Sequence, residues 1–372
     1  MAASASGPQT LVLEEAVRLA CGRSLESVEV AYETFGTLED AGGNAVLVCH
    51  ALSGDAHVAS GPGPAGSERP GWWEGMAGPG LPIDTDRYFV ICANVLGGCS
   101  GTTGPGSVDP STGERYGLRF PLVTIEDMVE VQARLLDSLG VDRLLAVVGG
   151  SMGGMQALAW ASRYPERVNA VVAAATTGRI GAQAIAFNEV GRAAILADPA
   201  FNGGDYELDL PPAEGLAIAR MVGHITYLSQ ESMREKFGRR LRDRDEHAFE
   251  FVSEFEVESY LAYQGRRFVE RFDANTYLYM TKAMDYFDWQ PPKSMLPRFL
   301  VTSFTSDWLF PTAQAREIVR VLLERDAEVT FAEIASPYGH DAFLLETERH
   351  GALVAAFLAR ALEDGRCLGG AL

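Results

Sequence analysis

The chain of 372 residues is longer than one hydrophobic core usually fills, so we expect a large core that carries a smaller inserted unit. Hydrophobic residues make up 47% of the chain and charged residues 22%, which is typical of folded globular proteins and argues against long disorder. The formal net charge of −19 argues against nucleic acid or an anionic membrane as a partner, because no basic stripe offsets phosphate repulsion.

The thiols and the first residues bear on the compartment. The five cysteines, an odd number without a close pair at metal-ligand spacing, predict neither a disulfide framework nor a metal site; they are Cys21, Cys49, Cys92, Cys99 and Cys367. Residues 1–7 lack the basic and apolar regions of a signal peptide, and no stretch approaches the roughly 18 apolar residues of a membrane helix. We therefore predict a cytoplasmic protein that contacts no membrane.

The first strands differ from the later ones. Residues 10–21 and 27–35 alternate apolar and polar side chains on either side of Gly22 and Arg23, which predicts an antiparallel hairpin at a sheet edge. By contrast, near-continuous apolar runs indicate central strands covered on both faces, at residues 45–49, 88–92 and 144–148.

Helices alternate with these strands. Residues 124–139 and 152–163 place apolar side chains at helical spacing, and further strands are predicted at residues 168–174, 298–303 and 329–334. This alternation indicates an α/β fold with a mostly parallel central sheet flanked by helices, formed by residues 1–177 and 298–372.

Residues 178–297 interrupt this alternation. They lack apolar strand runs and are rich in helix formers and charges, as in residues 233–250, so we interpret them as an inserted helical lid. An insertion that leaves the carboxyl edge of a doubly wound sheet can cover a ligand site there. Residues 61–80 are rich in Gly and Pro and indicate an irregular loop that Trp72 and Trp73 anchor.

A serine motif follows the strand at residues 144–148. The sequence Gly149-Gly-Ser151-Met-Gly153 matches G-x-S-x-G between a strand and a helix, the context in which this motif forms the nucleophile elbow of α/β hydrolases. Small neighbours are needed because the serine has strained backbone angles and strand and helix approach closely. We therefore predict that Ser151 is a nucleophile at the sheet edge.

A serine nucleophile needs a base, and the chain order in this fold is Ser, acid, His. His340 lies in a loop after the last predicted strand, whereas His224 and His247 lie in the lid and His350 in a helical pattern with polar neighbours. His340 is therefore the predicted base.

The acid is predicted to be Asp307, in the polar turn after the strand at residues 298–303. Asp307 could instead cap the helix that begins near Pro311, in which case Asp285 or Asp288 would be the acid.

Acyl transfer also needs backbone donors for the developing oxyanion. The motif predicts the amides of Met152 and Leu52, and Gly54 would let the loop around Leu52 turn inward. His50 in the same loop is interpreted as a structural hydrogen bonder rather than as a second base.

Several segments together resemble the homoserine O-acetyltransferase family over nearly the whole chain: His50-Ala-Leu-Ser-Gly-Asp-Ala-His57, Gly71-Trp-Trp, Gly78-Pro-Gly, Asn94-Val-Leu-Gly-Gly-Cys-Ser-Gly-Thr-Thr-Gly-Pro105, Gly149-Gly-Ser-Met-Gly-Gly-Met155 and Tyr338-Gly-His-Asp-Ala-Phe343. The resemblance implies a ping-pong reaction in which Ser151 takes acetyl from acetyl-CoA and passes it to L-homoserine, in methionine synthesis. It implies a cosubstrate but no permanently bound cofactor.

The resemblance also implies roles for two residues outside the triad. Arg220 matches the lid arginine that contacts substrate, and Asp341 matches the substrate-binding aspartate beside the histidine. Chemically, Arg220 suits a carboxylate and Asp341 an ammonium or hydroxyl group; without the resemblance, Arg220 would be taken for a surface residue. The family also implies a homodimer joined through lid helices, for which apolar residues in the segment 249–263 are available, although these could equally be core.

Other activities stay open at this stage. A homoserine O-succinyltransferase would need a cation in the acyl pocket, and the segment 97–104 offers none. Serine differs from homoserine by one carbon, a distinction worth roughly 1–3 kcal/mol. A carboxylesterase or a non-catalytic binding protein could share the fold, but an intact Ser, Asp and His set disfavours the latter.

Overall fold

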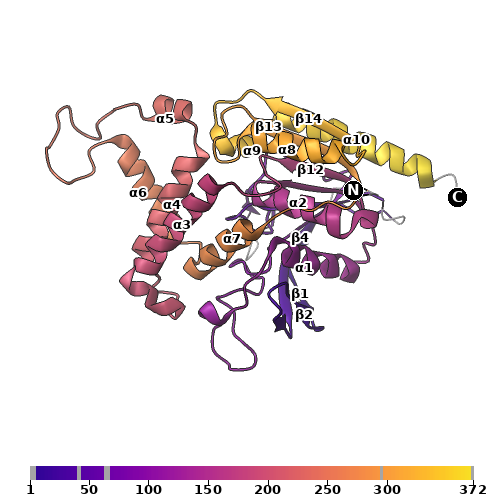
Figure 1. The fold of residues 1–372 in the computed structure, drawn as a ribbon, viewed down its shortest axis with the longest axis horizontal. Coiled ribbons are helices and arrows are strands. Elements are labelled where there is room, and N and C mark those ends of the chain that lie inside the picture. Colours follow the sequence, from indigo (N-terminus) through magenta and orange to yellow (C-terminus); the bar gives the residue numbers. More distant parts are fainter. Residues whose placement is uncertain (1–5, 40–42, 63–67, 294–295, 370–372) are drawn as a thin grey trace.

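The computed structural model describes residues 6–39, 43–62, 68–293 and 296–369, so the segment 1–5 and part of the loop 61–80 lie outside the described residues. An eight-stranded sheet runs through the molecule (Figure 1). Its order is β1 (Ser6–Leu13), β4 (Val28–Phe35), β10 (Phe89–Ala93), β5 (Ala45–Cys49), β11 (Leu144–Gly150), β12 (Val168–Ala174), β13 (Arg298–Phe304) and β14 (Val329–Ile334). The pairs on either side of β4 are antiparallel and the others are parallel.

The edge hairpin forms, but its turn is longer than the alternation predicts. Strand β1 ends at Leu13, opposite Val28, where two consecutive charged residues break the alternation. Between β1 and β4, a separate small hairpin of β2 (Val17–Arg18) and β3 (Ser24–Leu25) surrounds Gly22. Two further short pairs lie in the connections, β6 (Gly61–Pro62) with β7 (Glu68–Arg69) and β8 (Ala77–Gly78) with β9 (Ile83–Asp84).

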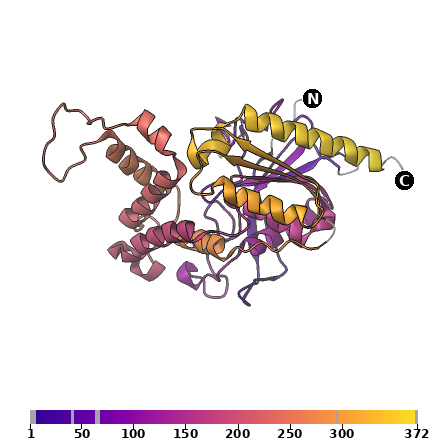
Figure 2. The ribbon, with the colours of Figure 1, turned by 45° about the horizontal axis from the view of Figure 1, so that its top comes forward.

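Helices cover both faces of the sheet (Figures 1 and 2). On one face, α1 (Ile125–Ser138), α2 (Met152–Arg163) and α8 (Thr312–Leu323) bury their apolar residues against alternate side chains of the central strands. On the other face, α10 (Arg349–Gly369) packs with Trp73 against the remaining strand residues. Each central strand is therefore buried on both sides, which accounts for its continuous apolar sequence.

The inserted segment 178–297, called the lid below, lies beside one end of the sheet (Figure 2). Its helices are α3 (Ala182–Ala197), α4 (Ala213–Tyr227), α5 (Gln230–Lys236), α6 (Glu256–Val269) and α7 (Ala274–Tyr286). A third apolar cluster lies among them, called the lid cluster, formed by Ile195, Phe201, Tyr206, Leu216, Ala219, Phe268, Phe272, Ala274, Tyr277 and Leu278. Helix α7 contributes Met280 and Ala283 to the apolar cluster on the α1, α2 and α8 face of the sheet, and α3 contributes Ala184. Both helices therefore join the lid to the core.

The charge-rich stretch 233–250 is helical only to Lys236. Gly238 has a φ of 54°, which ends the helix, and the following residues form an irregular segment whose Leu241 bridges Phe255. None of the described helices is both long and apolar enough to cross a membrane.

Candidate active site

Ser151 occupies a strained turn between β11 and α2. Its φ of 57° and ψ of −125° are rare for a residue other than glycine, and its amide donates a 3.0 Å hydrogen bond to the carbonyl of Ala174. The turn requires glycines on both sides. A Cβ on Gly149 would lie 2.1 Å from the carbonyl oxygen of Gly153, and a Cβ on Gly153 would lie 2.1 Å from that of Cys49.

His340 reaches Ser151 from the loop after β14. It lies in the short 3₁₀ helix η5 (Gly339–Asp341), which leads into α9 (Ala342–Leu345), and its Nε2 is 2.9 Å from Ser151 Oγ. The ring is buried between the aromatic rings of Phe310 and Phe343. Its acceptor nitrogen is thereby aimed at the serine hydroxyl.

Asp307 completes the chain of contacts. Its Oδ2 is 2.8 Å from His340 Nδ1, while its Oδ1 accepts hydrogen bonds from the amides of Leu309 and Phe310. These amides fix the carboxylate in its own turn after β13, and α8 begins without a side-chain cap. The structure thus brings Ser151, His340 and Asp307 together, in an arrangement in which the carboxylate orients the imidazole toward the hydroxyl.

The alternative acids lie elsewhere. Asp285 forms a buried ion pair with Arg192, and Asp288 is exposed, with the side-chain amide of Gln290 donating to its carboxylate. Among the other histidines, His350 lies at the start of α10 and is fully buried. Its Nε2 lies 3.2 Å from Thr302 Oγ1 on β13. Burial lowers the pKa of His350 to about 4.

The environment of His340 favours its protonated form. Burial opposes the imidazolium, but the Asp307 carboxylate outweighs it, with a smaller contribution from Asp341, and the pKa of His340 is raised above its ordinary value. A histidine that holds a proton in this way is suited to take one from a hydroxyl.

The two predicted amide donors lie beside the nucleophile. Met152 is the first residue of α2, and Leu52 lines the same small cavity as Ser151. Gly54 was expected to let the loop turn inward through its backbone freedom, but its φ is not positive. It is needed for space instead, because a Cβ at this position would lie 2.7 Å from the Cβ of His50. His50 itself is a hydrogen-bonding residue of the scaffold, because its Nδ1 donates to Ala51 and its Nε2 accepts from the Val95 amide.

The cavity at Ser151 is narrow, with a volume of about 40 Å³. Among the described residues, none that lines it is Lys or Arg; the lining includes Ile180, Phe187, Tyr277 and Leu309. The segment 97–104, whose lack of cations was our reason to expect an acetyl pocket, does not line this cavity. It folds against β4, where Thr102 and Thr103 accept hydrogen bonds from the strand amides.

The two residues assigned by resemblance both lie near His340. Asp341 follows His340 directly, and Arg220 lies on α4, with its guanidinium 5.5 Å from the ring centre of Tyr227 and 4.6 Å from that of Phe268. Burial raises the pKa of Asp341, although His340, Arg220 and Lys236 oppose that shift. The ring centre of Tyr227 is 6.0 Å from that of His340, so one aromatic ring contacts both the guanidinium and the imidazole.

A larger hollow, of about 850 Å³, is a different space. Leu228 and Trp308 line it, whereas their chain neighbours Tyr227 and Leu309 line the cavity at Ser151, so the two spaces share a wall.

Two supporting residues had no role assigned in the sequence analysis. Asn94 places its side-chain nitrogen 3.2 Å from His50 Nε2, and Tyr227 lines the Ser151 cavity. Asn94 lies in the family-like segment, so a search for polar partners of His50 could have found it. Tyr227 lies seven residues after Arg220 on α4, about two helical turns, and no local pattern marks it.

Comparison with known proteins agrees with this geometry. The sequence pattern of the α/β-hydrolase fold family matches residues 44–347, most of the chain. The class defined by the fold and by the serine, histidine and aspartate is therefore that of the α/β hydrolases.

Relatives narrow the class. The chain is 55% identical over 354 residues to the homoserine O-acetyltransferase of Solidesulfovibrio magneticus, covering 92% of this chain and 89% of the relative. It is also 55% identical over 355 residues to a homoserine O-succinyltransferase of Magnetococcus marinus, covering 91% of this chain and 90% of the relative.

Solved structures share the fold. The homoserine O-acetyltransferase of Bacillus anthracis superposes with a TM-score of 0.87 at 28% identity, covering 95% of this chain and 98% of that one. Esterase E22 superposes with a TM-score of 0.86 at 29% identity, covering 94% and 100%. The chain belongs to the homoserine O-acetyltransferase family.

Proposed function

We propose that this protein is a homoserine O-acetyltransferase that transfers acetyl from acetyl-CoA to the hydroxyl of L-homoserine in methionine biosynthesis. The observation that carries the proposal is the continuous contact from Asp307 through His340 to Ser151, at 2.8 and 2.9 Å, in a chain of this family. Such a contact activates a serine hydroxyl that is otherwise a poor nucleophile at neutral pH.

The reaction has two halves. Ser151 Oγ attacks the thioester carbonyl while His340 Nε2 takes its proton, and the CoA sulfur leaves with that proton as a thiol. The homoserine hydroxyl then gives its proton to His340 and attacks the acetyl-serine, and Ser151 recovers the proton as O-acetylhomoserine leaves. In both halves the amides of Leu52 and Met152 stabilise the tetrahedral oxyanion.

The cavity at Ser151 supports acetyl as the acyl group. Its volume of about 40 Å³ suits a small acyl group, and a succinyl carboxylate would need a cation that the described lining residues do not supply. The succinyl-transferring relative keeps succinyl-CoA as the second candidate.

Arg220 and Asp341 are the proposed acceptor site. The Arg220 guanidinium is close enough to Asp341 to lower the pKa of its carboxyl group, and this combination of a cation and a carboxyl group matches the carboxylate and ammonium groups of an amino acid. The lid over the serine keeps water from the acetyl-enzyme while the acceptor enters. Serine as acceptor is an alternative that the assay below tests directly.

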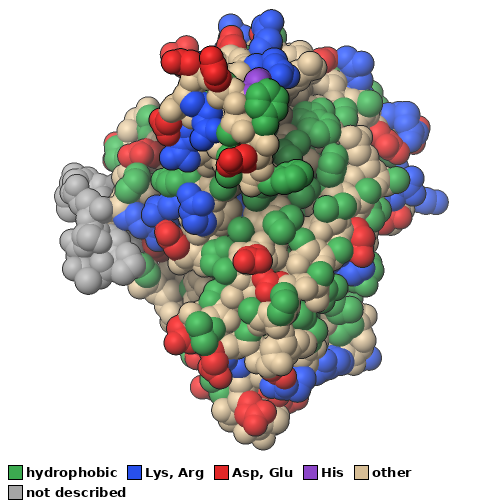
Figure 3. Space-filling view, turned by 90° about the vertical axis from the view of Figure 1, so that its left-hand side faces the viewer, with side chains coloured by type: hydrophobic (Ala, Val, Ile, Leu, Met, Phe, Trp, Pro, Cys, Tyr) green, Lys and Arg blue, Asp and Glu red, His purple; other side chains and the backbone are tan. Residues whose placement is uncertain are grey.

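The proposal includes a cytoplasmic homodimer joined through the lid. Several large apolar side chains of the lid are exposed, namely Ile218, Ile225, Phe249, Phe251, Val252 and Tyr263. Figure 3 shows hydrophobic side chains spread over this face of the molecule. An apolar surface of this kind is typical of a protein interface.

The test is the release of free thiol from acetyl-CoA or succinyl-CoA, with and without L-homoserine or L-serine, using the Ser151→Ala variant as the control. We expect release from acetyl-CoA that depends on homoserine and falls at least about 10³-fold in the variant. A preference for succinyl-CoA would identify the sister activity, and release indifferent to the acceptor would overturn the transferase in favour of an esterase.

A further inference from the structure

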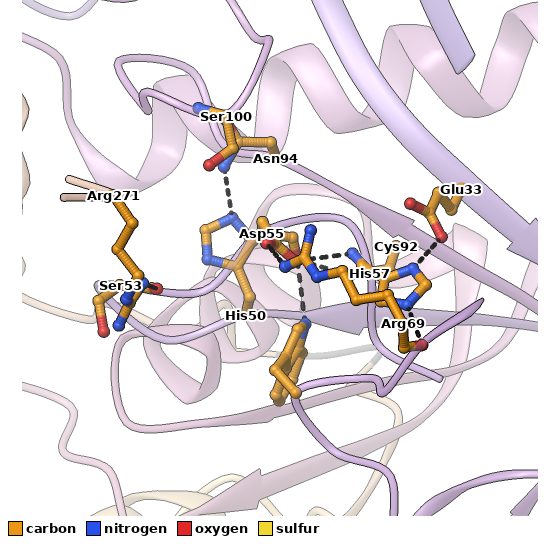
Figure 4. A network of polar contacts seen from close by, with 11 residues as sticks. Glu33, His50, Ser53, Asp55, His57, Arg69, Cys92, Asn94, Ser100 and Arg271 are labelled. Carbon is orange, nitrogen blue, oxygen red and sulfur yellow. Dashed lines mark hydrogen bonds and ion pairs between the residues drawn. The ribbon is translucent and has the colours of Figure 1, made fainter. Parts of the chain in front are cut away.

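The loop that carries Leu52, residues 50–57, is called the oxyanion loop below, and polar groups of the core hold both of its ends (Figure 4). At its start, His50 Nε2 accepts from the Val95 amide at 3.2 Å. At its end, the carbonyl of Asp55 accepts from the Trp72 indole at 3.0 Å, and its carboxylate pairs with Arg69.

A buried pair reinforces the second end of the oxyanion loop. His57 Nδ1 is 2.7 Å from Glu33 Oε2 on β4, and His57 Nε2 donates to the carbonyl of Arg69 at 2.8 Å. Both side chains are almost fully buried. These contacts fix the ends of the loop to the core, whereas the residues between them are only partly buried.

The middle of the oxyanion loop contacts the lid instead. Arg271, in the connection between α6 and α7, donates from Nη1 to the carbonyl of Ser53 at 3.0 Å. The Leu52 side chain packs against the lid cluster as well as against the core, so two adjacent loop residues touch the insertion. Figure 4 shows Arg271 and Ser53 together on the side of His50 opposite to His57.

We propose that Arg271 is a positioning residue that makes the oxyanion hole depend on the lid. Its hydrogen bond to the Ser53 carbonyl holds the chain just after Leu52, and so keeps the Leu52 amide pointing at the developing oxyanion. This proposal deepens the proposed function and rests on an acyl-serine intermediate at Ser151. Donors that act on a transition state must be held within fractions of an ångström, which gives a single hydrogen bond of this kind a measurable effect.

The experiment measures the rate at which p-nitrophenyl acetate acetylates the enzyme, in rapid mixing without CoA or homoserine. For Arg271→Ala we expect acetylation to slow by about 10- to 100-fold, because the amide is misplaced rather than removed. Arg271→Lys, which keeps a donor of similar length, should recover part of the rate. Affinity for an alkyl boronic acid, which forms a tetrahedral adduct on the serine, should fall in parallel, whereas the homoserine KM should not change.

The matched control is Arg267→Ala on α6, whose exposed guanidinium pairs with Glu270 and which should acetylate at the normal rate. Normal acetylation of Arg271→Ala with a raised homoserine KM would overturn the proposal and make Arg271 an acceptor-binding residue. An equal loss in Arg267→Ala would also overturn it. Failure of the proposed function would give a different result. In that case Ser151→Ala would still be acetylated, or the acetyl group of the unmutated acetyl-enzyme would not pass to homoserine.

Discussion

His340 has a pKa above its ordinary value because the Asp307 carboxylate outweighs burial. The base works only when neutral, so activity must fall as the pH falls through this raised pKa, and the acid limb of kcat/KM lies higher than for an ordinary imidazole. In Asp307→Asn the carboxylate is lost and burial prevails, so the limb should move to lower pH while the maximal rate drops by roughly 10³-fold or more. A pH–rate profile between about pH 5 and 9 measures both effects. If the acid limb of kcat/KM lies at the same pH in Asp307→Asn as in the unmutated protein, Asp307 does not set the pKa of His340.

A substitution of Gly153 tests the close packing of the turn at Ser151 rather than its chemistry. Gly153→Ala places a Cβ 2.1 Å from the Cys49 carbonyl, and backbone must shift because no flexible side chain can yield. We expect the free energy of unfolding to fall by about 3 kcal/mol, measured by urea denaturation. Gly106→Ala, which meets no atom within 4 Å, is the control and should leave stability unchanged. Equal stabilities would contradict the close contact of β5 with α2.

At the scale of elements, a buried ion pair joins two helices of the lid. Arg192 on α3 and Asp285 at the end of α7 approach to 2.7 Å in a geometry poor for a hydrogen bond, and Asn188 donates to the same carboxylate. Arg192 keeps its contact with Glu189 through Nε and Nη2, so Asp285→Ala leaves Nη1 and the Asn188 amide without the carboxylate. We therefore expect the free energy of unfolding to fall by about 1–3 kcal/mol.

Chemical unfolding of Asp285→Ala, followed by tryptophan fluorescence, measures this loss. The exposed pair of Arg267 and Glu270 supplies the comparison, because Glu270→Ala breaks a solvated contact and should have no measurable effect. If both variants unfold alike, the pair does not stabilise the contact of α3 with α7.

The elements that could be predicted are those whose signals are local in the sequence. The central strands and α2 were predicted to within two residues because continuous burial and helical periodicity are local signals, and Ser151, His340 and Asp307 follow from one motif and the chain order. The helices of the lid had no predicted limits, and the stretch 233–250, singled out as rich in helix formers, is helical only to Lys236. Contacts such as Arg271 with Ser53 join residues 218 positions apart, so no sequence period indicates them.

At the scale of the whole molecule, the exposed apolar residues of the lid predict a dimer. Phe249 and Phe251 are 93% and 111% exposed. We expect the unmutated protein to have twice the chain mass of 40.1 kDa and the double variant Phe249→Asp with Phe251→Asp to have the mass of a single chain. Light scattering after size exclusion measures both masses. Val108→Asp, an exposed apolar site on the core, is the control and should stay dimeric. A monomeric unmutated protein would refute the dimer outright.

The order of strands in the sheet also has a consequence for biosynthesis. Strand β12 ends at Ala174, but its partner β13 begins only at Arg298, after the whole lid has been made. While the ribosome translates the lid, the apolar edge of β12 has no neighbour, and unpaired strand edges promote aggregation. The nascent chain therefore passes through a long interval in which six of the eight strands exist without the aspartate and the histidine. Prematurely terminated chains that end within the lid should be inactive and should depend on chaperones for their solubility.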